Sequence, residues 1–93
     1  MAKKNTLPMK KIQEILKKNH IARAGIFGSY AREEQHKNSD VDILVAFNGS
    51  LFGIVKLERE LEKGLGKKID LLNYNGIHPL LKKRILKEEV RIL

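Results

Sequence analysis

Two short motifs decide the fold of this chain: Gly28-Ser29 and, after the ten residues Tyr30 to Ser39, Asp40-Val41-Asp42. Gly28 ends an apolar run over residues 21–27, and Ser29 is a residue type that caps helices. We therefore predict a strand, a sharp turn and a short helix through Glu33. Residues 40–47 predict a second strand, on which Asp40 and Asp42 share a face because they are two positions apart.

The Gly-Ser turn and the acidic strand together predict a binding site for a nucleoside triphosphate and a divalent metal. Unpaired backbone N–H groups at the start of the short helix would attract an anion. Two neighbouring carboxylates on a mostly apolar strand repel each other, and a hard cation such as Mg²⁺ relieves that cost. Asp70 lies in a predicted third strand over residues 67–72, where a third acid would reach the same metals or hold an acceptor hydroxyl.

Length and composition limit the remaining possibilities. The 93 residues predict a single domain, residues 1–93, with one modest core. The absence of cysteine excludes disulfide scaffolds, thiol catalysis and Cys-ligated zinc. No segment approaches the length of a membrane span, and residues 1–6 lack the apolar stretch of a signal peptide. We expect a cytoplasmic protein without membrane contact.

The formal net charge of +8 favours an anionic partner, which charge alone cannot identify. The few aromatic residues are scattered, whereas a platform for single-stranded nucleic acid would interleave them with basic residues. Solvated lysine-rich helix faces explain most of the charge, so direct nucleic-acid binding is not favoured.

The remaining periodicities predict helices over residues 7–19, over residues 51–63 and from Pro79 to about residue 86. The second of these helices carries one apolar stripe, formed by Ile54, Leu57, Leu61 and Leu65. Residues 35–39 read as a loop, and residues 89–93 are ambiguous. Helices and strands therefore alternate, beginning and ending with a helix. An α/β fold with a small mixed sheet and helices packed on it is the simplest way to bury the apolar stripes.

Gly28-Ser29-Tyr30-Ala31-Arg32 and Ser39-Asp40-Val41-Asp42-Ile43-Leu44-Val45 together resemble the signature of the polymerase-β-like nucleotidyltransferases. With the short size, the strand around Asp70 and the last helix, the chain resembles minimal nucleotidyltransferases of the MntA type. Those proteins are the antitoxin half of HEPN/MNT toxin–antitoxin pairs. The spaced pattern is specific where either half alone is weak.

The resemblance implies transfer of AMP from ATP to a tyrosine of a HEPN ribonuclease toxin, which silences the toxin. It implies two Mg²⁺ ions held by Asp40, Asp42 and Asp70 as catalytic and metal-binding residues. It also implies that Gly28 and Ser29 hold the phosphates. Arg32, one turn into the predicted helix, is positioned to neutralise triphosphate charge.

Several residues have a simpler interpretation. Arg32 would equally form a surface ion pair with Glu33, Glu34 or another acid, and Asp70 would pair with Lys67 or Lys68. Tyr30 is expected to pack against the sheet rather than touch the nucleotide. The three histidines, His20, His36 and His78, are expected to cap elements or be exposed, since they lack metal-ligand spacing.

Three other functions remain open at the level of sequence. The first is an antitoxin that covers its toxin without catalysis. The second is a nucleotidyltransferase with another acceptor, and the third is a small basic RNA-binding module. The intact acids favour an enzyme.

Overall fold

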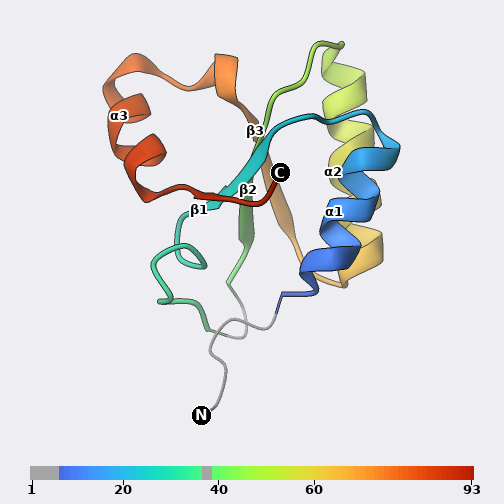
Figure 1. Cartoon of the computed structure of the whole chain (residues 1–93), viewed down its shortest axis with the longest axis horizontal. Helices are drawn as coiled ribbons and strands as arrows, with labels where there is room; N and C mark the ends of the chain where they lie inside the picture. The colour runs from blue at the N-terminus through green and yellow to red at the C-terminus, as the bar shows by residue number, and fades with distance from the viewer. Residues whose placement is uncertain (1–6, 37–38) are drawn as a thin grey trace.

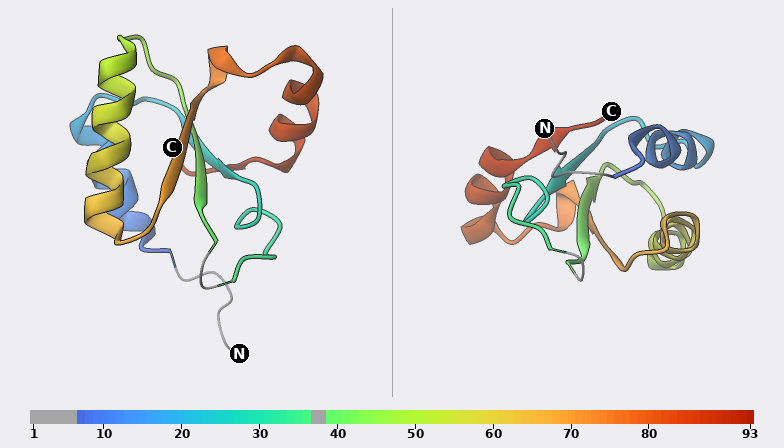
Figure 2. Two further views of the ribbon diagram at one scale, coloured as in Figure 1. Left: turned by 180° about the vertical axis from the view of Figure 1, so that it is seen from behind. Right: turned by 90° about the horizontal axis from the view of Figure 1, so that it is seen from below.

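A computed structural model of the chain describes residues 7–36 and 39–93, which form a four-stranded sheet between helices. Helices α1 (Met9–Lys18) and α2 (Leu51–Leu65) lie together on one face of the sheet, and α3 (Pro79–Glu88) lies on the other (Figures 1 and 2). The strands are β1 (Ala24–Phe27), β2 (Val41–Val45), β3 (Ile69–Asn73) and β4 (Val90–Arg91), with a 3-10 turn η1 (Tyr74–Gly76) after β3.

The sheet has the strand order β3-β2-β1-β4, and its pairing is mixed. Strands β2 and β3 are parallel and are joined by α2, whereas β1 is antiparallel to both β2 and β4. A parallel pair needs a crossover, and a helix is its usual form. The predicted α/β fold with a small mixed sheet is therefore confirmed.

The short helix predicted after Gly28-Ser29 is wrong, because residues 28–33 form a single turn. The N–H of Arg32 donates to the carbonyl of Gly28 at 3.1 Å, and the N–H of Glu34 donates to that of Ser29 at 2.8 Å. Glu33 then has a φ of 59°, a left-handed conformation that ends the turn. The hydrogen bonds of a single helical turn offset little of the conformational entropy lost when the turn forms, so contacts with the surrounding structure decide the shape of this segment. We call residues 28–33 the phosphate turn, after the ligand that the sequence predicts for it.

Residues 89–93, ambiguous in the sequence, supply the edge strand β4. Its register pairs Gly25 with Arg91 and Ile26 with Val90. The chain therefore passes from α3 back to β1, which places the C-terminal end of α3 beside the strand that leads into the phosphate turn (Figure 1).

The main core lies between the sheet and the pair of helices α1 and α2. Its largest fully buried side chains are Ile12, Leu16, Ile43, Leu57, Leu61, Ile69, Val41 and Val45. The stripe predicted for α2 is confirmed, because Leu57 and Leu61 are buried while Ile54 and Leu65 pack against the cluster. Tyr30 is also buried in this core, as predicted, with 4% of its surface exposed.

The outer edge of β3 is covered by two glutamates of α2. Glu62 accepts a hydrogen bond from the N–H of Ile69 at 3.2 Å, and Glu58 accepts one from the N–H of Leu71 at 3.0 Å. An open strand edge presents unpaired N–H groups that favour association with other strands. These two carboxylates satisfy two N–H groups of that edge and fix the position of β3 against α2.

In the part of the chain that the structure describes, no helix is long and apolar enough to cross a membrane. The predicted loop over residues 35–39 includes residues 37 and 38, which lie outside the described residues. Residues 1–6, for which no signal peptide was expected, also lie outside them.

We expect Leu61→Ala to destabilise the fold by about 2–5 kcal/mol, because it leaves a cavity in a fully buried site. Val55→Ala on the same helix is the matched control. Val55 is 41% exposed, so this change should shift the free energy of unfolding by no more than about 0.5 kcal/mol. Urea denaturation of the two variants checks the difference, and equal losses would show that the core is placed wrongly.

Candidate active site

Two of the predicted acids lie side by side across the sheet. The register pairs Asp42 with Asp70 on β3 and with Phe27 at the end of β1. Paired residues project from the same face, and Val41 and Ile43 belong to the core under α1 and α2. The carboxylates of Asp42 and Asp70 therefore project toward the opposite face, on the side of α3.

Gly28 lies directly against the carboxylate of Asp42. A Cβ atom at position 28 would collide with the Oδ2 atom of Asp42. Gly28 also has a φ of +76°, a conformation that side chains other than glycine rarely adopt. The two halves of the sequence motif thus meet in space as predicted, and glycine is required there on both counts.

The phosphate turn leaves backbone donors unused. Within the described residues, the N–H groups of Ser29, Tyr30 and Ala31 have no hydrogen-bond acceptor. The next three N–H groups, those of Arg32, Glu33 and Glu34, are bonded within the turn. Successive free N–H groups in a turn form a concave binding place for an anion even without a full helix.

The pKa of the Asp42 carboxyl is raised to about 6, chiefly by burial. The charges of Asp70 and Asp40 and a hydrogen bond with Asp70 contribute to this rise, and the positive charge of Arg32 opposes it. Asp42 is partly buried and Asp70 is exposed. A carboxylate in this position is costly to ionise near neutral pH unless a cation lies next to it.

The donor set fits a hard divalent cation. Asp40, Asp42 and Asp70 offer carboxylate oxygens, the ligands that Mg²⁺ prefers, and the repulsion among them is what such an ion would relieve. Among residues 7–36 and 39–93, no three acidic or histidine side chains are already arranged to hold a metal. The structure thus brings Asp42 and Asp70 together as a pair, with Asp40 near enough to act on the charge of Asp42.

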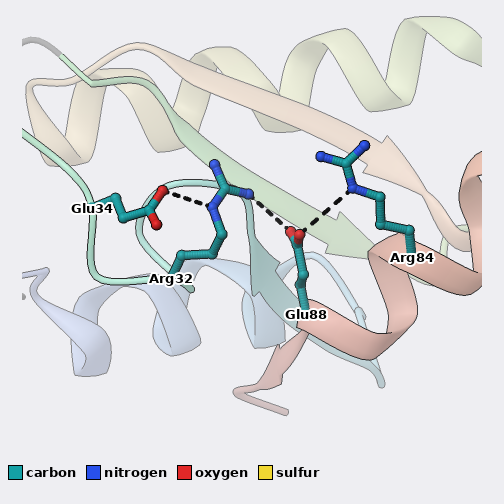
Figure 3. A network of polar contacts seen from close by, with 4 residues as sticks. All are labelled: Arg32, Glu34, Arg84 and Glu88. Atoms are coloured by element: carbon teal, nitrogen blue, oxygen red, sulfur yellow. Dashed lines mark hydrogen bonds and ion pairs between the residues drawn. The ribbon is translucent and has the colours of Figure 1, made fainter.

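Arg32 forms the surface ion pairs that were one of its two predicted roles. Its Nε lies 2.9 Å from Glu34, and its Nη1 lies 3.0 Å from Glu88 at the end of α3 (Figure 3). Arg84, one turn earlier on α3, lies 3.8 Å from the same carboxylate. The hydrogen bond to Glu34 is the main cause that raises the pKa of Arg32. Because Arg32 acts on the charge of Asp42, these pairs lie at the edge of the acidic site.

Glu88 is the residue at this site that sequence reasoning missed. It is separated from Arg32 by 56 positions, and only its pairing with Arg84 at spacing i, i+4 was visible in the sequence. The contact depends on β4, whose pairing with β1 places the end of α3 beside the turn.

The simpler interpretation of Asp70 is not observed, since none of the ion pairs among the described residues joins it to Lys67 or Lys68. The Nζ of Lys67 instead lies 6.0 Å from the ring centre of Tyr30. The prediction for the histidines is confirmed. His78 Nδ1 accepts the N–H of Leu80 at 3.1 Å and caps α3, while His20 and His36 are exposed.

Residues 10–93 match the model of a protein family described as polymerase beta, nucleotidyltransferase. The chain belongs to this family. A relative from Methanocaldococcus jannaschii, named "Putative protein adenylyltransferase MJ0435", is 57% identical over 86 residues, which cover 90% of this chain and 92% of the relative. "Protein adenylyltransferase MntA" of Thermococcus cleftensis is 37% identical over 82 residues, or 86% of this chain and 83% of the relative.

A solved structure described as a toxin–antitoxin with AMP-PNP superposes with a TM-score of 0.84. It is 26% identical in sequence, and the match covers 94% of this chain and 73% of that one. The fold and the nucleotidyltransferase class predicted from the motif are thereby confirmed. The roles of the individual site residues stay predictions.

We expect Asp42→Asn to stabilise the metal-free protein by about 1 kcal/mol between about pH 7 and 8, with little effect at about pH 4. An unfolded aspartate titrates near 3.8 and Asp42 at about 6. The stability from the neutral carboxyl is therefore fully present below the unfolded pKa and is lost as the pH rises through the folded one. Urea denaturation in EDTA across this range checks the divergence. Parallel pH profiles for the two proteins would contradict it.

We expect Gly28→Ala to weaken binding of Mg²⁺ and AMP-PNP by at least about tenfold, because the new methyl group displaces Asp42 or shifts the phosphate turn. The strained φ should also cost about 1–2 kcal/mol of stability. Gly76→Ala is the control, since the nearest atom to its Cβ lies at 4.0 Å and its φ is not positive. Calorimetric titration measures the binding. Unchanged affinity in Gly28→Ala would show that the turn does not contribute to nucleotide binding.

Proposed function

We propose that the chain is an Mg²⁺-dependent antitoxin enzyme that transfers AMP from ATP to a tyrosine of a HEPN-type ribonuclease toxin. The observation that carries the proposal is Asp42, which lies between the backbone of Gly28 and the carboxylate of Asp70. The names of the relatives support adenylyl transfer, and the similar toxin–antitoxin structure with AMP-PNP supports the nucleotide and the kind of partner.

In this proposal the phosphate turn binds the triphosphate. The free N–H groups of Ser29, Tyr30 and Ala31 donate to phosphate oxygens, and the absence of a Cβ at Gly28 lets the chain approach Asp42. The α-phosphate then lies toward the acids, and the rest of the triphosphate lies along the turn.

Asp40, Asp42 and Asp70 would hold the metal. When bound, Mg²⁺ supplies neutralisation of the triphosphate charge and a lower pKa for the attacking hydroxyl. The carboxylates fit that task because burial of Asp42 and the charges of Asp70 and Asp40 together raise the pKa of Asp42, and Arg32 offsets only part of that effect. No base with the pKa of histidine is needed.

The reaction exchanges one bond to phosphorus for another. The tyrosine oxygen attacks the α-phosphorus, a new P–O bond forms, and the bond from that phosphorus to the bridging oxygen breaks with release of pyrophosphate. The hydroxyl proton passes to Asp70, which is exposed and therefore accessible to an acceptor from outside the molecule. The protein contributes positioning and electrostatics, which is typical of transfer to and from phosphates.

The decisive test incubates the chain with ATP, Mg²⁺ and the product of the adjacent gene, where that gene encodes a HEPN-type protein, followed by mass measurement of that product. We expect the partner to gain the mass of AMP. Asp42→Asn should lower the rate by at least about a hundredfold, since it removes several kcal/mol of charge stabilisation. Asp40→Asn should act in the same direction, and EDTA should abolish transfer by the wild type.

Glu60→Gln is the control for these variants. Glu60 is an acid of α2 that pairs with Lys18 at 2.6 Å, and it should leave transfer unchanged. Transfer of AMP to a residue other than tyrosine would show that the proposed acceptor is wrong and that the protein is a nucleotidyltransferase with another acceptor. Neutralisation of the toxin by wild type and Asp42→Asn alike, with no AMP gained, would establish an antitoxin that acts by binding alone. Tight, salt-sensitive RNA binding without nucleotide would instead identify an RNA-binding module.

A further inference from the structure

Glu88 joins α3 to the phosphate turn through a charge network of three further side chains (Figure 3). Its carboxylate accepts from Nη1 of Arg32 at 3.0 Å and lies 3.8 Å from Nε of Arg84. The Glu88 side chain is 23% exposed, against 39% for Arg32 and 73% for Arg84. Glu88 is therefore the most enclosed member of these pairs, and it has two arginines within reach.

Arg32 is both the group that Glu88 holds and the cation of the phosphate turn. Its Nε and Nη1 are taken by Glu34 and Glu88, and its Nη2 has no hydrogen-bond partner among the described residues. A guanidinium binds a phosphate through a pair of parallel N–H groups, in the same geometry that it uses for a carboxylate. Each pair of parallel N–H groups on Arg32, Nε with Nη2 or Nη1 with Nη2, includes an atom that already donates to a glutamate, so a phosphate competes with Glu34 or Glu88 for it.

A triphosphate in the turn would also bring negative charge toward Glu88. The triphosphate and the Glu88 carboxylate repel each other, so the position of Glu88 beside Arg32 becomes less favourable once the site is filled. Arg84 provides an alternative partner for Glu88. It lies one helical turn before Glu88 on α3 and is free to move closer, since most of its side chain is in solvent.

We propose that Glu88 restrains Arg32 in the nucleotide-free protein and, when a triphosphate binds, yields Arg32 to the phosphates and pairs with Arg84. Glu88 is then a positioning residue that sets the affinity of the site without touching the nucleotide. This inference rests on the proposed function, because it requires a nucleoside triphosphate beside Gly28 and Ser29.

The test measures binding of AMP-PNP with Mg²⁺ to the full chain by calorimetric titration. Glu88→Gln should lower the dissociation constant by roughly two- to fivefold, the range expected for release of one exposed ion pair. Arg84→Gln should raise it by a similar factor, because Glu88 then has only Arg32 as a partner. Arg32→Gln should weaken binding more than Arg84→Gln does.

Two double variants separate this exchange from a general effect of charge. The gain from Glu88→Gln should vanish in an Arg32→Gln background, and the loss from Arg84→Gln should vanish in a Glu88→Gln background. A long-range field would leave each effect in place. Glu60→Gln is the matched control, an ion-paired glutamate with 30% side-chain exposure, and it should not change the affinity. Urea denaturation confirms that each variant is folded.

Unchanged affinity in Glu88→Gln, or the same gain with and without Arg32, would overturn the inference. Unchanged affinity in Arg32→Gln would also overturn it, since Arg32 would not reach the phosphates. The expected order of affinities in a protein that transfers no AMP would support the inference and reject the proposed reaction. Failure of the wild type to bind AMP-PNP would reject both.

Discussion

The close approach of Gly28 to the Asp42 carboxylate is the constraint on which the site depends. It requires a residue without a side chain, in a left-handed conformation, at the point where β1 ends. The pairing of Phe27 with Asp42 fixes where that point lies relative to β2. A shift of the register by one residue would turn Asp42 into the core and remove the contact. The antiparallel pairing of β1 and β2 is therefore as much a part of the site as the acids.

The core explains why that register is held. Ala24 and Ile26 of β1, and Val41, Ile43 and Val45 of β2, all pack toward α1 and α2. These alternating positions leave the acids no orientation except the opposite face. The two glutamates of α2 that cover the edge of β3 hold Asp70 at the same level as Asp42. Burial on one face thus supplies the free energy that offsets acidic repulsion on the other.

The sequence predicted the parts of this arrangement that depend on local pattern. The Gly-Ser turn, the acidic strand and the apolar stripe of α2 each carry their signal within a few residues, and their positions agree with the structure. The helix expected after Ser29 failed, because a segment this short is shaped by contacts such as that of Arg32 with Glu88. Strand β4 is two residues long and was invisible for the same reason. Contacts between distant segments leave no periodic trace.

The charge of the chain has opposite effects on a nucleotide at long range and close to the acidic site. A net charge of +8 attracts nucleotide from solution, yet the surface that would receive it contains three aspartates and the glutamates paired with Arg32. Near the acids a bare triphosphate meets repulsion, and Arg32, the cation that acts on Asp42, is already shared between Glu34 and Glu88. Only a ligand that brings its own positive charge removes that repulsion. In the proposed function the acidic site would therefore favour a metal-complexed nucleotide over a free one, and the basic remainder of the chain would increase the rate of encounter for either.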